Sequence, residues 1–449
     1  MKSIFYRTGL LAIFSIAILI SGCSDKSVTV NQTTSLSPAT SSFSGDFAYD
    51  WTYTTNRIIA DQQPNPPKGS RILSYVAVAM YEAVVAGIPN SRSMAGQLRD
   101  MPQMPAANAD SVYDWPSVLT AATSTVVRGI FDTLYPTSAV LVNTTYNTEY
   151  NSRVSSVGQN IVDRSIRHGN DIGAAIIQWA HTDQYIETRT MHCTIPPRTQ
   201  NPAYWAPINP GDVPTEPFWG LIKPFVLEQP DMFTIHNPYP FDTVPGSPFY
   251  ADADEISQIA LNLTQEQINI ALFWNDKLRT PTPPGHWFSI AMQVMQQKHY
   301  SLDKAVQVFV AVGAAGRDAF IACWKEKYDK DLLRPETYIR QYIRPDFYPY
   351  IQTPSFPEYP SGHSSYSGAS SQVLTNLIGD NVTFTDMTNV PINIPPRTFS
   401  SFFAAATEAG FSRMYGGIHF RTANLNGIQM GKSIGAYVTS KLKFYIYSN

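Results

Sequence analysis

The sequence predicts an all-α protein made of helical bundles, with two four-helix-bundle halves packed as one unit. Three observations carry this prediction. Segments with apolar residues at helical spacing dominate the 449 residues, strand-like alternation is scarce, and no internal repeat with a period of roughly 20 to 50 residues is present. Since 43% of the residues are hydrophobic and only 15% are charged, the helices can bury one face each in a large core.

Charge and hydropathy exclude two classes of protein. The formal net charge is −3, from 32 Lys and Arg against 35 Asp and Glu, and no run of basic residues occurs. A nucleic-acid binder needs a basic patch, so we expect no nucleic-acid partner. The mean hydropathy of −0.17 and the absence of an apolar stretch of spanning length after residue 20 argue against a multispan membrane protein.

Residues 1–22 are typical of a lipoprotein signal peptide. A short basic segment precedes an apolar stretch over 10–20, which is too short for a stable transmembrane helix. The tetrapeptide ISGC that ends at Cys23 is similar to a bacterial lipobox, so we expect lipidation of Cys23. The following Ser/Thr-rich segment predicts a flexible tether over 23–48. The protein is therefore expected to be exported and anchored to a bacterial membrane, on the periplasmic or surface side of the outer membrane, or secreted.

The N-terminal helical half covers residues 49–254. Apolar stripes predict helices over 71–86, 116–134 and 157–180. The pattern then breaks over 195–250, where 13 prolines fall between Pro196 and Pro248. We expect a long irregular loop there, whose aromatic side chains pack onto the body or cover a site.

The C-terminal helical bundle covers residues 255–449. Helical patterns return in six segments: 255–274, 286–297, 302–333, 364–378, 399–413 and 419–443. No composition break between the two halves is typical of a linker, which favours one cooperative unit. Cys193 and Cys323 give no metal-ligand spacing and leave open whether they form a disulfide.

Two segments of the C-terminal half carry basic residues and glycines in patterns that suit an anion. In WKEKYDKDLLRP, residues 324–335, Lys327 and Arg334 lie close to one helical stripe, although such a stripe is more often a solvated charged face. In SRMYGGIHFR, residues 412–421, two glycines interrupt a helix. Arg413 and His419 can therefore enter one pocket from two different segments.

A third segment, FPEYPSGH at residues 356–363, begins a helix. Gly362 permits a close backbone approach, and the first amides of the helix are free donors that favour an anion. Ser361 alone would be an ordinary cap, but His363 places a titratable imidazole directly behind this turn. Together the three segments supply three cations, a hydroxyl, amides and two imidazoles. This set suits a tetrahedral oxyanion such as phosphate or vanadate, and no carboxylate cluster for a divalent metal is apparent in the sequence.

The order Lys-x6-Arg-Pro, Pro-Ser-Gly-His and Ser-Arg-x5-His resembles the tripartite signature of vanadium-dependent haloperoxidases and type 2 phosphatidic-acid and acid phosphatases. The resemblance covers residues 255–443 and implies that the C-terminal bundle is catalytic. It implies that Lys327, Arg334 and Arg413 hold the equatorial oxygens of vanadate, with Ser361 and the Gly362 amide completing the cradle. His419 would be the axial vanadium ligand, and His363 the acid/base that deprotonates hydrogen peroxide. Vanadate(V) would then activate peroxide, so that halide is oxidised to hypohalite.

Within this superfamily the haloperoxidases fit better than the phosphatases. The chain is about twice the size of the small acid phosphatases, and the phosphatase Asp four residues after the second His is replaced by Ala423. Trp324 and Phe356 stand where haloperoxidases line a halide pocket, although both also suit a core. An acid phosphatase inhibited by vanadate, with His419 forming a phosphohistidine, remains the alternative. A surface carbohydrate-binding lipoprotein, with 8 Trp and 25 Tyr as stacking platforms, would leave the oxyanion residues unexplained.

Two finer expectations follow from the resemblance. Asp276 lies in a region where haloperoxidases supply a carboxylate that pairs with the second vanadate-binding arginine, here Arg413. Algal bromoperoxidases have a second histidine where this chain has Phe356, which leaves chloride or iodide as the halide. The segment around residues 356–363 is similar to that of bacterial iodide oxidisers, so iodide is favoured.

Overall fold

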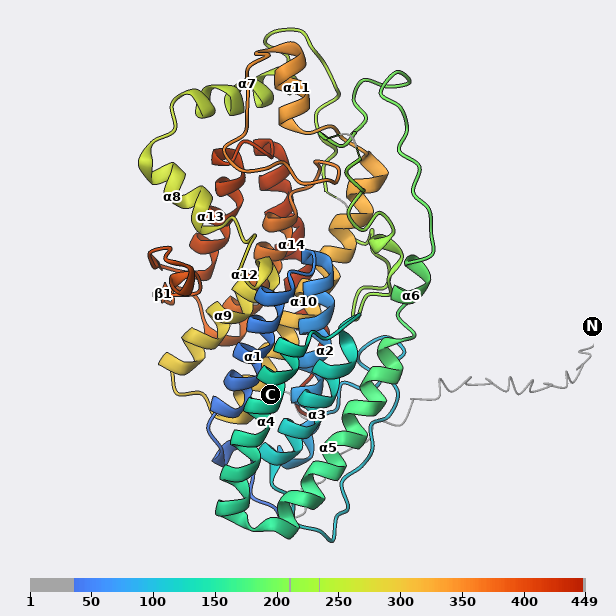
Figure 1. The fold of residues 1–449 in the computed structure, drawn as a ribbon, viewed down its shortest axis with the longest axis vertical. Coiled ribbons are helices and arrows are strands. Elements are labelled where there is room, and N and C mark those ends of the chain that lie inside the picture. Colours follow the sequence, from blue (N-terminus) through green and yellow to red (C-terminus); the bar gives the residue numbers. More distant parts are fainter. Residues whose placement is uncertain (1–35, 210, 234, 447–449) are drawn as a thin grey trace, which may run out of the picture.

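The computed structural model describes residues 36–209, 211–233 and 235–446. These residues form fourteen α-helices, four short 3-10 helices and one two-stranded hairpin, so the all-α prediction is confirmed. Helices α4 (Pro136–Val157) and α5 (Gln159–Ala180) lie toward one end of the long axis, and α7 (Pro248–Leu261) and α11 (Pro335–Tyr342) lie toward the other (Figure 1). The predicted signal peptide 1–22 and Cys23 fall outside the described residues.

Six helices belong to the N-terminal half, and the three predicted there correspond to α2, α3 and α5. The six are α1 (Asp46–Gln62), α2 (Pro66–Val84), α3 (Trp115–Ile130), α4 (Pro136–Val157), α5 (Gln159–Ala180) and α6 (Tyr185–Thr188). Helix α4 was not predicted, because its residues are polar around most of the helix and only Ser138, Val142 and Glu149 are buried.

The body of the protein begins within the segment predicted as a tether over 23–48. A 3-10 helix, η1 (Thr40–Ser42), precedes α1, and the other 3-10 helices are η2 (Val85–Gly87), η3 (Trp219–Leu221) and η4 (Val390–Ile392). Thr40 is fully buried, and its hydroxyl donates to the carbonyl oxygen of Val84 at 2.9 Å. Residues 40–48 are therefore part of the packed structure, which the Ser/Thr composition of the segment did not reveal.

Eight helices and the hairpin form the C-terminal half. They are α7 (Pro248–Leu261), α8 (Gln265–Phe273), α9 (Thr282–Gln297), α10 (Leu302–Lys330), α11 (Pro335–Tyr342), α12 (Gly362–Ile378), α13 (Phe402–Tyr415), α14 (Arg421–Lys441), β1 (Phe384–Asp386) and β2 (Arg397–Phe399). The strands pair antiparallel, with Phe384 opposite Phe399. The single helix predicted over 255–274 is two helices, because Thr264 and Gln267 form a capping box that starts α8.

The described residues of the proline-rich stretch between α6 and α7 are irregular apart from η3. It packs onto the body, since Trp205, Trp219 and Phe225 are buried. The Trp205 amide donates to the carbonyl oxygen of Asp331 at 2.8 Å, just beyond the end of α10. The loop therefore covers the end of the helix that carries Lys327.

Helix α10 is shared by both halves. It packs against α2 on one side and against α12 and α14 on the other, and one hydrophobic core contains Val76 of α2, Val310 of α10 and Val373 of α12. Gly313 lies so close to α2 that a Cβ atom there would be 3.1 Å from Cα of Ser74. The two halves therefore share a core and are not separated by a polar interface.

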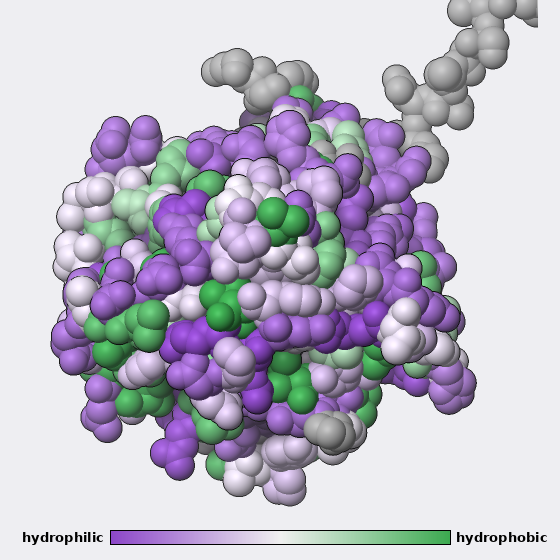
Figure 2. Space-filling model, turned by 90° about the horizontal axis from the view of Figure 1, so that it is seen from above, coloured by the Kyte–Doolittle hydropathy of each residue, from purple (hydrophilic) through white to green (hydrophobic). Residues whose placement is uncertain are grey.

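Among the described residues, segments 66–87 and 302–330 are long and apolar enough to cross a membrane by length and composition. This differs from the expectation that no such stretch follows residue 20. Both segments are core helices of the structure, because 94% and 100% of their apolar windows are buried. The end of the molecule where α7 and α11 lie is largely hydrophilic, with apolar residues scattered over it (Figure 2). Cys193 is exposed and Cys323 is buried, and both are free thiols.

Candidate functional site

Three segments that are far apart in the sequence meet at one end of the C-terminal bundle. Lys327 lies in the last turn of α10, and Arg334 is the residue that precedes α11. Arg413 lies in the last turn of α13, and His419 follows the Gly416–Gly417 turn, two residues before α14 begins. Gly417 has a φ of +78°, which favours glycine and lets the chain reverse between the two helices.

We call the pocket formed by Lys327, Arg334, Arg413, His363 and His419 the cradle. Its three cations, Lys327, Arg334 and Arg413, are buried. The Lys327 ammonium donates to the carbonyl oxygens of Pro357 and Glu358 at 3.0 and 2.9 Å. The Arg334 guanidinium donates through Nε to the carbonyl oxygen of Phe356 at 2.8 Å and through Nη1 to that of Ile418 at 2.9 Å. Burial lowers the pKa of Lys327 to about 7 and the pKa values of Arg334 and Arg413 to about 10. An anion bound among them would offset this cost of burial.

Two donors of the cradle are available to a bound anion. Nη2 of Arg334 and Nη2 of Arg413 are buried and have no hydrogen-bond partner among the described residues. A buried N–H group without a partner costs free energy, and a guanidinium leaves its donors in a planar fork that fits an oxyanion. The arrangement is therefore suited to a tetrahedral oxyanion with several oxygens.

His419 is fixed by a carboxylate that the sequence analysis did not assign. Glu358 Oε1 lies 2.8 Å from His419 Nδ1 and also accepts the Phe420 amide at 3.0 Å. On the opposite side of the ring, Nε2 lies 3.1 Å from Arg334 Nη1. Because a guanidinium can only donate, this contact requires the proton of His419 to be on Nδ1, and Nε2 keeps its lone pair. His419 can therefore act as a ligand or nucleophile through Nε2.

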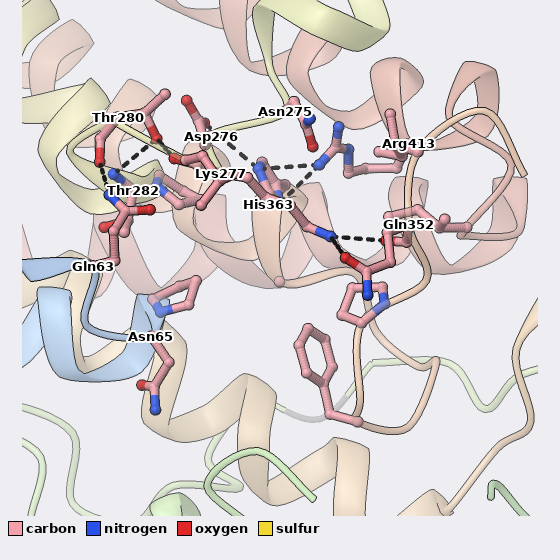
Figure 3. Close-up of a pocket in the computed structure, with 18 of the residues that line it drawn as sticks. Gln63, Asn65, Asn275, Asp276, Lys277, Thr280, Thr282, Gln352, His363 and Arg413 are labelled. Atoms are coloured by element: carbon pink, nitrogen blue, oxygen red, sulfur yellow. Dashed lines mark hydrogen bonds and ion pairs between the residues drawn. The ribbon is translucent and has the colours of Figure 1, made fainter. Parts of the chain in front are cut away.

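His363 occupies the other side of the cradle, next to Arg413. Its Nε2 lies 3.2 Å from Arg413 Nη1 and 3.5 Å from Asp276 Oδ2 (Figure 3). Burial and then the charge of Arg413 lower the pKa of His363 to about 4. The imidazole is thus neutral at neutral pH and can accept a proton from a molecule bound in the cradle.

Ser361 and Gly362 form the start of α12. The Ser361 hydroxyl accepts the Ser364 amide at 3.4 Å, so this side chain caps the helix. Gly362 is in the lining of the cavity, and Ser361 is buried behind it in the chain. A Cβ atom on Gly362 would lie 3.3 Å from the Trp324 ring. Glycine at this position therefore permits close packing of the turn on the indole.

Trp324 and Phe356 form an aromatic wall beside the cations. Their ring centroids are 5.2 Å apart, and the Phe356 centroid lies 4.7 Å from the Arg334 guanidinium carbon. The Trp324 indole N–H donates to the carbonyl oxygen of Thr215 at 3.1 Å, in the proline-rich loop. Both rings belong to the lining of the cavity and also to the hydrophobic core.

The cradle opens into a cavity of about 570 Å³. His363, Arg413 and His419 lie in its lining together with Asn65 from the connection between α1 and α2. Figure 3 shows Asn275, Lys277 and Gln352 in the same lining. Both halves of the chain therefore shape the access to the cradle.

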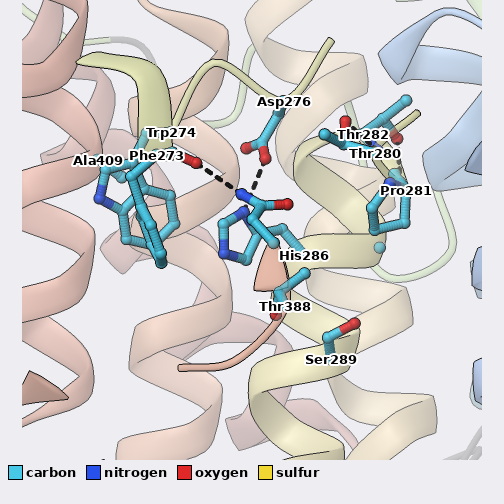
Figure 4. Close-up of polar contacts among 12 residues, drawn as sticks. Phe273, Trp274, Asp276, Thr280, Pro281, Thr282, His286, Ser289, Thr388 and Ala409 are labelled. Atoms are coloured by element: carbon cyan, nitrogen blue, oxygen red, sulfur yellow. Dashed lines mark hydrogen bonds and ion pairs between the residues drawn. The ribbon is translucent and has the colours of Figure 1, made fainter. Parts of the chain in front are cut away.

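Asp276 belongs to a buried chain of charges. Its Oδ1 lies 2.7 Å from His286 Nδ1 (Figure 4). On the other side of the ring, His286 Nε2 lies 2.7 Å from Asp386 Oδ2. The Trp274 ring stacks on His286 at a centroid distance of 4.6 Å. Among the described residues no hydrogen bond joins Asp276 to Arg413, which differs from the expected pairing, although the Asp276 charge still acts to raise the pKa of Arg413. Oδ1 of Asp276 instead contacts His286, and Oδ2 lies 3.5 Å from Nε2 of His363.

His286 carries a positive charge at neutral pH. Burial acts to lower its pKa, but Asp276 and Asp386 outweigh burial and raise the pKa to about 10. Because the folded-state pKa exceeds the ordinary value of 6.5, the stabilisation is fully present below pH 6.5 and is lost as the pH rises through about 10. We expect His286→Phe to lower the free energy of unfolding by about 3–5 kcal/mol near pH 6.5, since it leaves buried carboxylates without their cation. Urea unfolding between pH 6.5 and 10 measures this loss, which should shrink toward pH 10.

His168 provides a matched control for this experiment. It is a buried histidine beside Tyr113, and burial lowers its pKa, so it is neutral throughout this pH range. His168→Phe should therefore change stability by an amount that is constant from pH 7 to 10. A constant difference for His286→Phe as well would mean that His286 is neutral in the folded protein.

Sequence reasoning missed Glu358, His286, Asp386 and Lys277. Glu358 offered one signal, a lone carboxylate in an otherwise apolar segment directly before the Ser-Gly-His turn. His286 and Asp386 lie 100 residues apart and offered none, because a sequence does not show that β1 comes to lie beside α9.

Comparisons with known proteins agree with this geometry. A family model described as "VCPO second helical-bundle domain" matches residues 307–346 and 343–448. The chain is similar to a bacterial vanadium-dependent iodoperoxidase of known structure, with 32% identity and a TM-score of 0.83 over 90% of this chain and 97% of that one. Two structures of bacterial vanadium-dependent chloroperoxidase, one apo-type and one holo-type, match at 16% and 17% identity with TM-scores of 0.65 and 0.61. They cover 84% and 85% of this chain and 95% and 96% of theirs, and share its fold. No curated protein matches the sequence significantly.

Proposed function

Because the chain belongs to the vanadium-dependent haloperoxidases, we propose that it oxidises iodide in preference to bromide and chloride, with hydrogen peroxide as the oxidant. Family membership makes the protein a haloperoxidase with vanadate as its cofactor. The preference for iodide is carried by the similarity to the bacterial iodoperoxidase, at 32% identity over 90% of the chain. Phe356 supports it, because a phenyl ring beside the cradle adds no hydrogen bond to the bound oxygens as a histidine would.

The residues of the cradle fit vanadate. Arg334 and Arg413 each have a buried guanidinium N–H without a partner among the described residues, and Lys327 adds a third buried cation. We assign these three residues to the vanadate oxygens, with the Ser361 hydroxyl and the Gly362 amide beside them. When bound, pentavalent vanadate supplies a Lewis acid that makes a peroxide oxygen electrophilic toward halide.

The two histidines have different tasks in this proposal. Nε2 of His419 would bind the vanadium, because the Glu358 contact keeps the ring proton on Nδ1 and leaves the lone pair of Nε2 on the cradle side. Metal-bound histidines commonly donate their other ring N–H in this way. His363 accepts the proton of hydrogen peroxide, since it is neutral at neutral pH and lines the same cavity.

The aromatic wall suits a large and weakly hydrated halide. Trp324 and Phe356 line the cavity beside the cradle, and several aliphatic side chains continue the apolar surface outward, including Leu272, Ile351 and Ile394. Removing an anion from water costs less as its radius grows, because the Born energy falls with ionic size. Iodide can therefore enter this cavity at a lower cost than chloride.

The test is reconstitution of vanadium-free protein with orthovanadate. We expect peroxide-dependent oxidation of iodide to appear with the added vanadate, with a higher kcat/KM for iodide than for bromide or chloride. Phosphate should slow reconstitution because it competes for the same three cations. Halide oxidation that persists without vanadium, or a higher kcat/KM for bromide, would contradict the proposal.

Phosphate-ester hydrolysis is the second arm of the same experiment. The pairing of His419 with Glu358 would also orient a histidine that attacks phosphorus, since Nε2 keeps its lone pair. Vanadium-free protein is assayed with an aryl phosphate, with and without vanadate. Hydrolysis that vanadate inhibits, without any halide oxidation, would favour the phosphatase reaction.

Glu358→Gln is expected to weaken vanadate binding by about 10-fold to 100-fold, the usual cost of losing a carboxylate behind a metal-bound histidine. The amide keeps the shape of the side chain but replaces the carboxyl oxygen that accepts the Nδ1 proton of His419 with a weaker acceptor. Equilibrium dialysis against vanadate measures the dissociation constant. Glu336→Gln is the matched control, because Glu336 is a buried glutamate of α11 that bonds Thr353 outside the cradle. Equal vanadate affinity of both variants would exclude this role for Glu358.

We also propose that the chain is exported and anchored through a lipid on Cys23. Support comes from the sequence alone, in the ISGC tetrapeptide that follows the apolar stretch. Metabolic labelling with a fatty acid should mark the wild-type protein in the membrane fraction and leave Cys23→Ser unlabelled. Labelling of Cys23→Ser would overturn this assignment.

A further inference from the structure

The connection between α8 and α9 presents side chains to the mouth of the cavity. Asp276, Arg279 and Thr282 all have φ values between +50° and +64°, so three non-glycine residues adopt the left-handed conformation within seven positions. Such conformations are costly and are commonly retained where function requires a fixed geometry. Here Asp276 is directed at His286, while its neighbours Asn275 and Lys277 line the cavity (Figure 3).

Lys277 has no carboxylate partner in the part of the chain that the structure describes. Its ammonium donates to the backbone oxygen of Gln352 at 3.1 Å and to Oε1 of the same residue at 3.3 Å, both of which are neutral acceptors. Lys298 and some other lysines of the described chain also lack an ion pair, but Lys277 is the only described lysine in the lining of this cavity. Lys277 thus brings a positive charge to the cavity that no ion pair among the described residues neutralises.

The position of Lys277 links it to the cradle. Lys277 and Arg413 line the same cavity, and burial, followed by the charges of Arg413 and Arg334, lowers the pKa of Lys277 to about 8. An anion that approaches the cradle through the cavity passes a charge that is attractive and only partly screened by solvent. Hydrogen peroxide is neutral and gains much less from this charge.

Asn275 adds a polar group beside Lys277. Its side-chain oxygen is buried and has no hydrogen-bond partner among the described residues. Because Asn275 lines the cavity, its side-chain amide can offer N–H donors to a molecule bound there. An ammonium and an amide next to apolar side chains suit a large monovalent anion.

We propose that Lys277 and Asn275 form an outer halide-binding site, where iodide is captured before it reaches the vanadate cradle. The inference rests on the proposed function, because halide is the substrate that has to cross this cavity. It assigns a specificity-determining role to Lys277, which acts on the halide and not on vanadate or peroxide.

Steady-state kinetics of the vanadate-loaded enzyme test the proposal. Lys277→Met is expected to raise KM for iodide by about tenfold at low ionic strength, with kcat, KM for peroxide and vanadium content unchanged. Lys277→Arg should retain most of the affinity for iodide. Lys298→Met makes the same change of charge at the exposed end of α9, outside the cavity lining, and should leave KM for iodide unchanged.

A second measurement does not depend on turnover. Crystals of vanadium-free wild-type protein soaked in iodide should give an anomalous difference peak beside the Lys277 ammonium, and crystals of Lys277→Met should not. An unchanged KM for iodide in Lys277→Met, an equal rise in Lys298→Met, loss of vanadium from Lys277→Met, or a peak that persists in Lys277→Met would each overturn the proposal. A wild-type enzyme that oxidises no iodide would instead contradict the proposed function, whatever the crystals show.

Discussion

His419→Ala is expected to abolish both vanadate retention and halide oxidation. His419 is the only residue of the cradle to which we assign a bond to vanadium. Alanine has no side-chain nitrogen that could replace Nε2. The three cations would remain and would still attract the anion weakly, so the variant should bind vanadate only while it is present in excess. Vanadium content per chain after gel filtration measures retention, and peroxide-dependent iodide oxidation measures activity.

His181→Ala is the control for this variant. His181 is exposed at the end of α5, outside the cavity lining. The His181→Ala variant should retain as much vanadium per chain as the wild-type protein. Full vanadium retention by His419→Ala would show that the axial ligand is another residue.

His363→Ala is expected to retain vanadate but to slow turnover by about 10²-fold to 10⁴-fold, the usual contribution of a positioned acid/base. His363 reaches the cradle from the start of α12 and touches Arg413, but it is not needed to hold the anion. Measurements of kcat with iodide at saturating peroxide, alongside vanadium content, separate the two effects. Because the side chain of His363 is 17% exposed in the cavity, added imidazole should restore part of the lost rate.

The contrast between the two histidine variants is the decisive observation. Equal loss of vanadium from His419→Ala and His363→Ala would mean that the roles are wrongly divided. Loss of activity without rescue by imidazole, at full vanadium content, would mean that His363 acts by fixing Arg413 and not by moving a proton.

The sequence was sufficient for the parts of the site that depend on local structure. Helical spacing, proline at the start of α11 and the paired glycines before His419 each fix where a side chain leaves its helix. Three such segments in a recognisable order were enough to predict a common pocket. The structure places Lys327, Arg334, Arg413 and both histidines around one cradle.

The parts that depend on long-range packing could not be predicted. Glu358 lies in an irregular segment without periodicity, so nothing in the sequence indicated that it faces His419. The charge state of Asp276 depends on His286 and, beyond it, on Asp386 in the hairpin. Helix α4 escaped prediction because its amphipathic pattern is weak, whereas the break between α7 and α8 had a visible signal in the capping box at Thr264.

The sharing of α10 between the two halves has a consequence for recombination. A chimera that takes residues 255–449 from one relative and the preceding residues from another would place an unfamiliar α2 against Gly313, where only 3.1 Å separates a Cβ atom from Ser74. A larger side chain at either position would displace α10 and move Lys327, which lies fourteen residues farther along the same helix. Functional exchange between relatives therefore requires α2 and α10 to be inherited together. Substitutions in the N-terminal half, which carries none of the signature motifs, can therefore change the catalytic site. Among relatives, substitutions in α2 should be correlated with substitutions in α10.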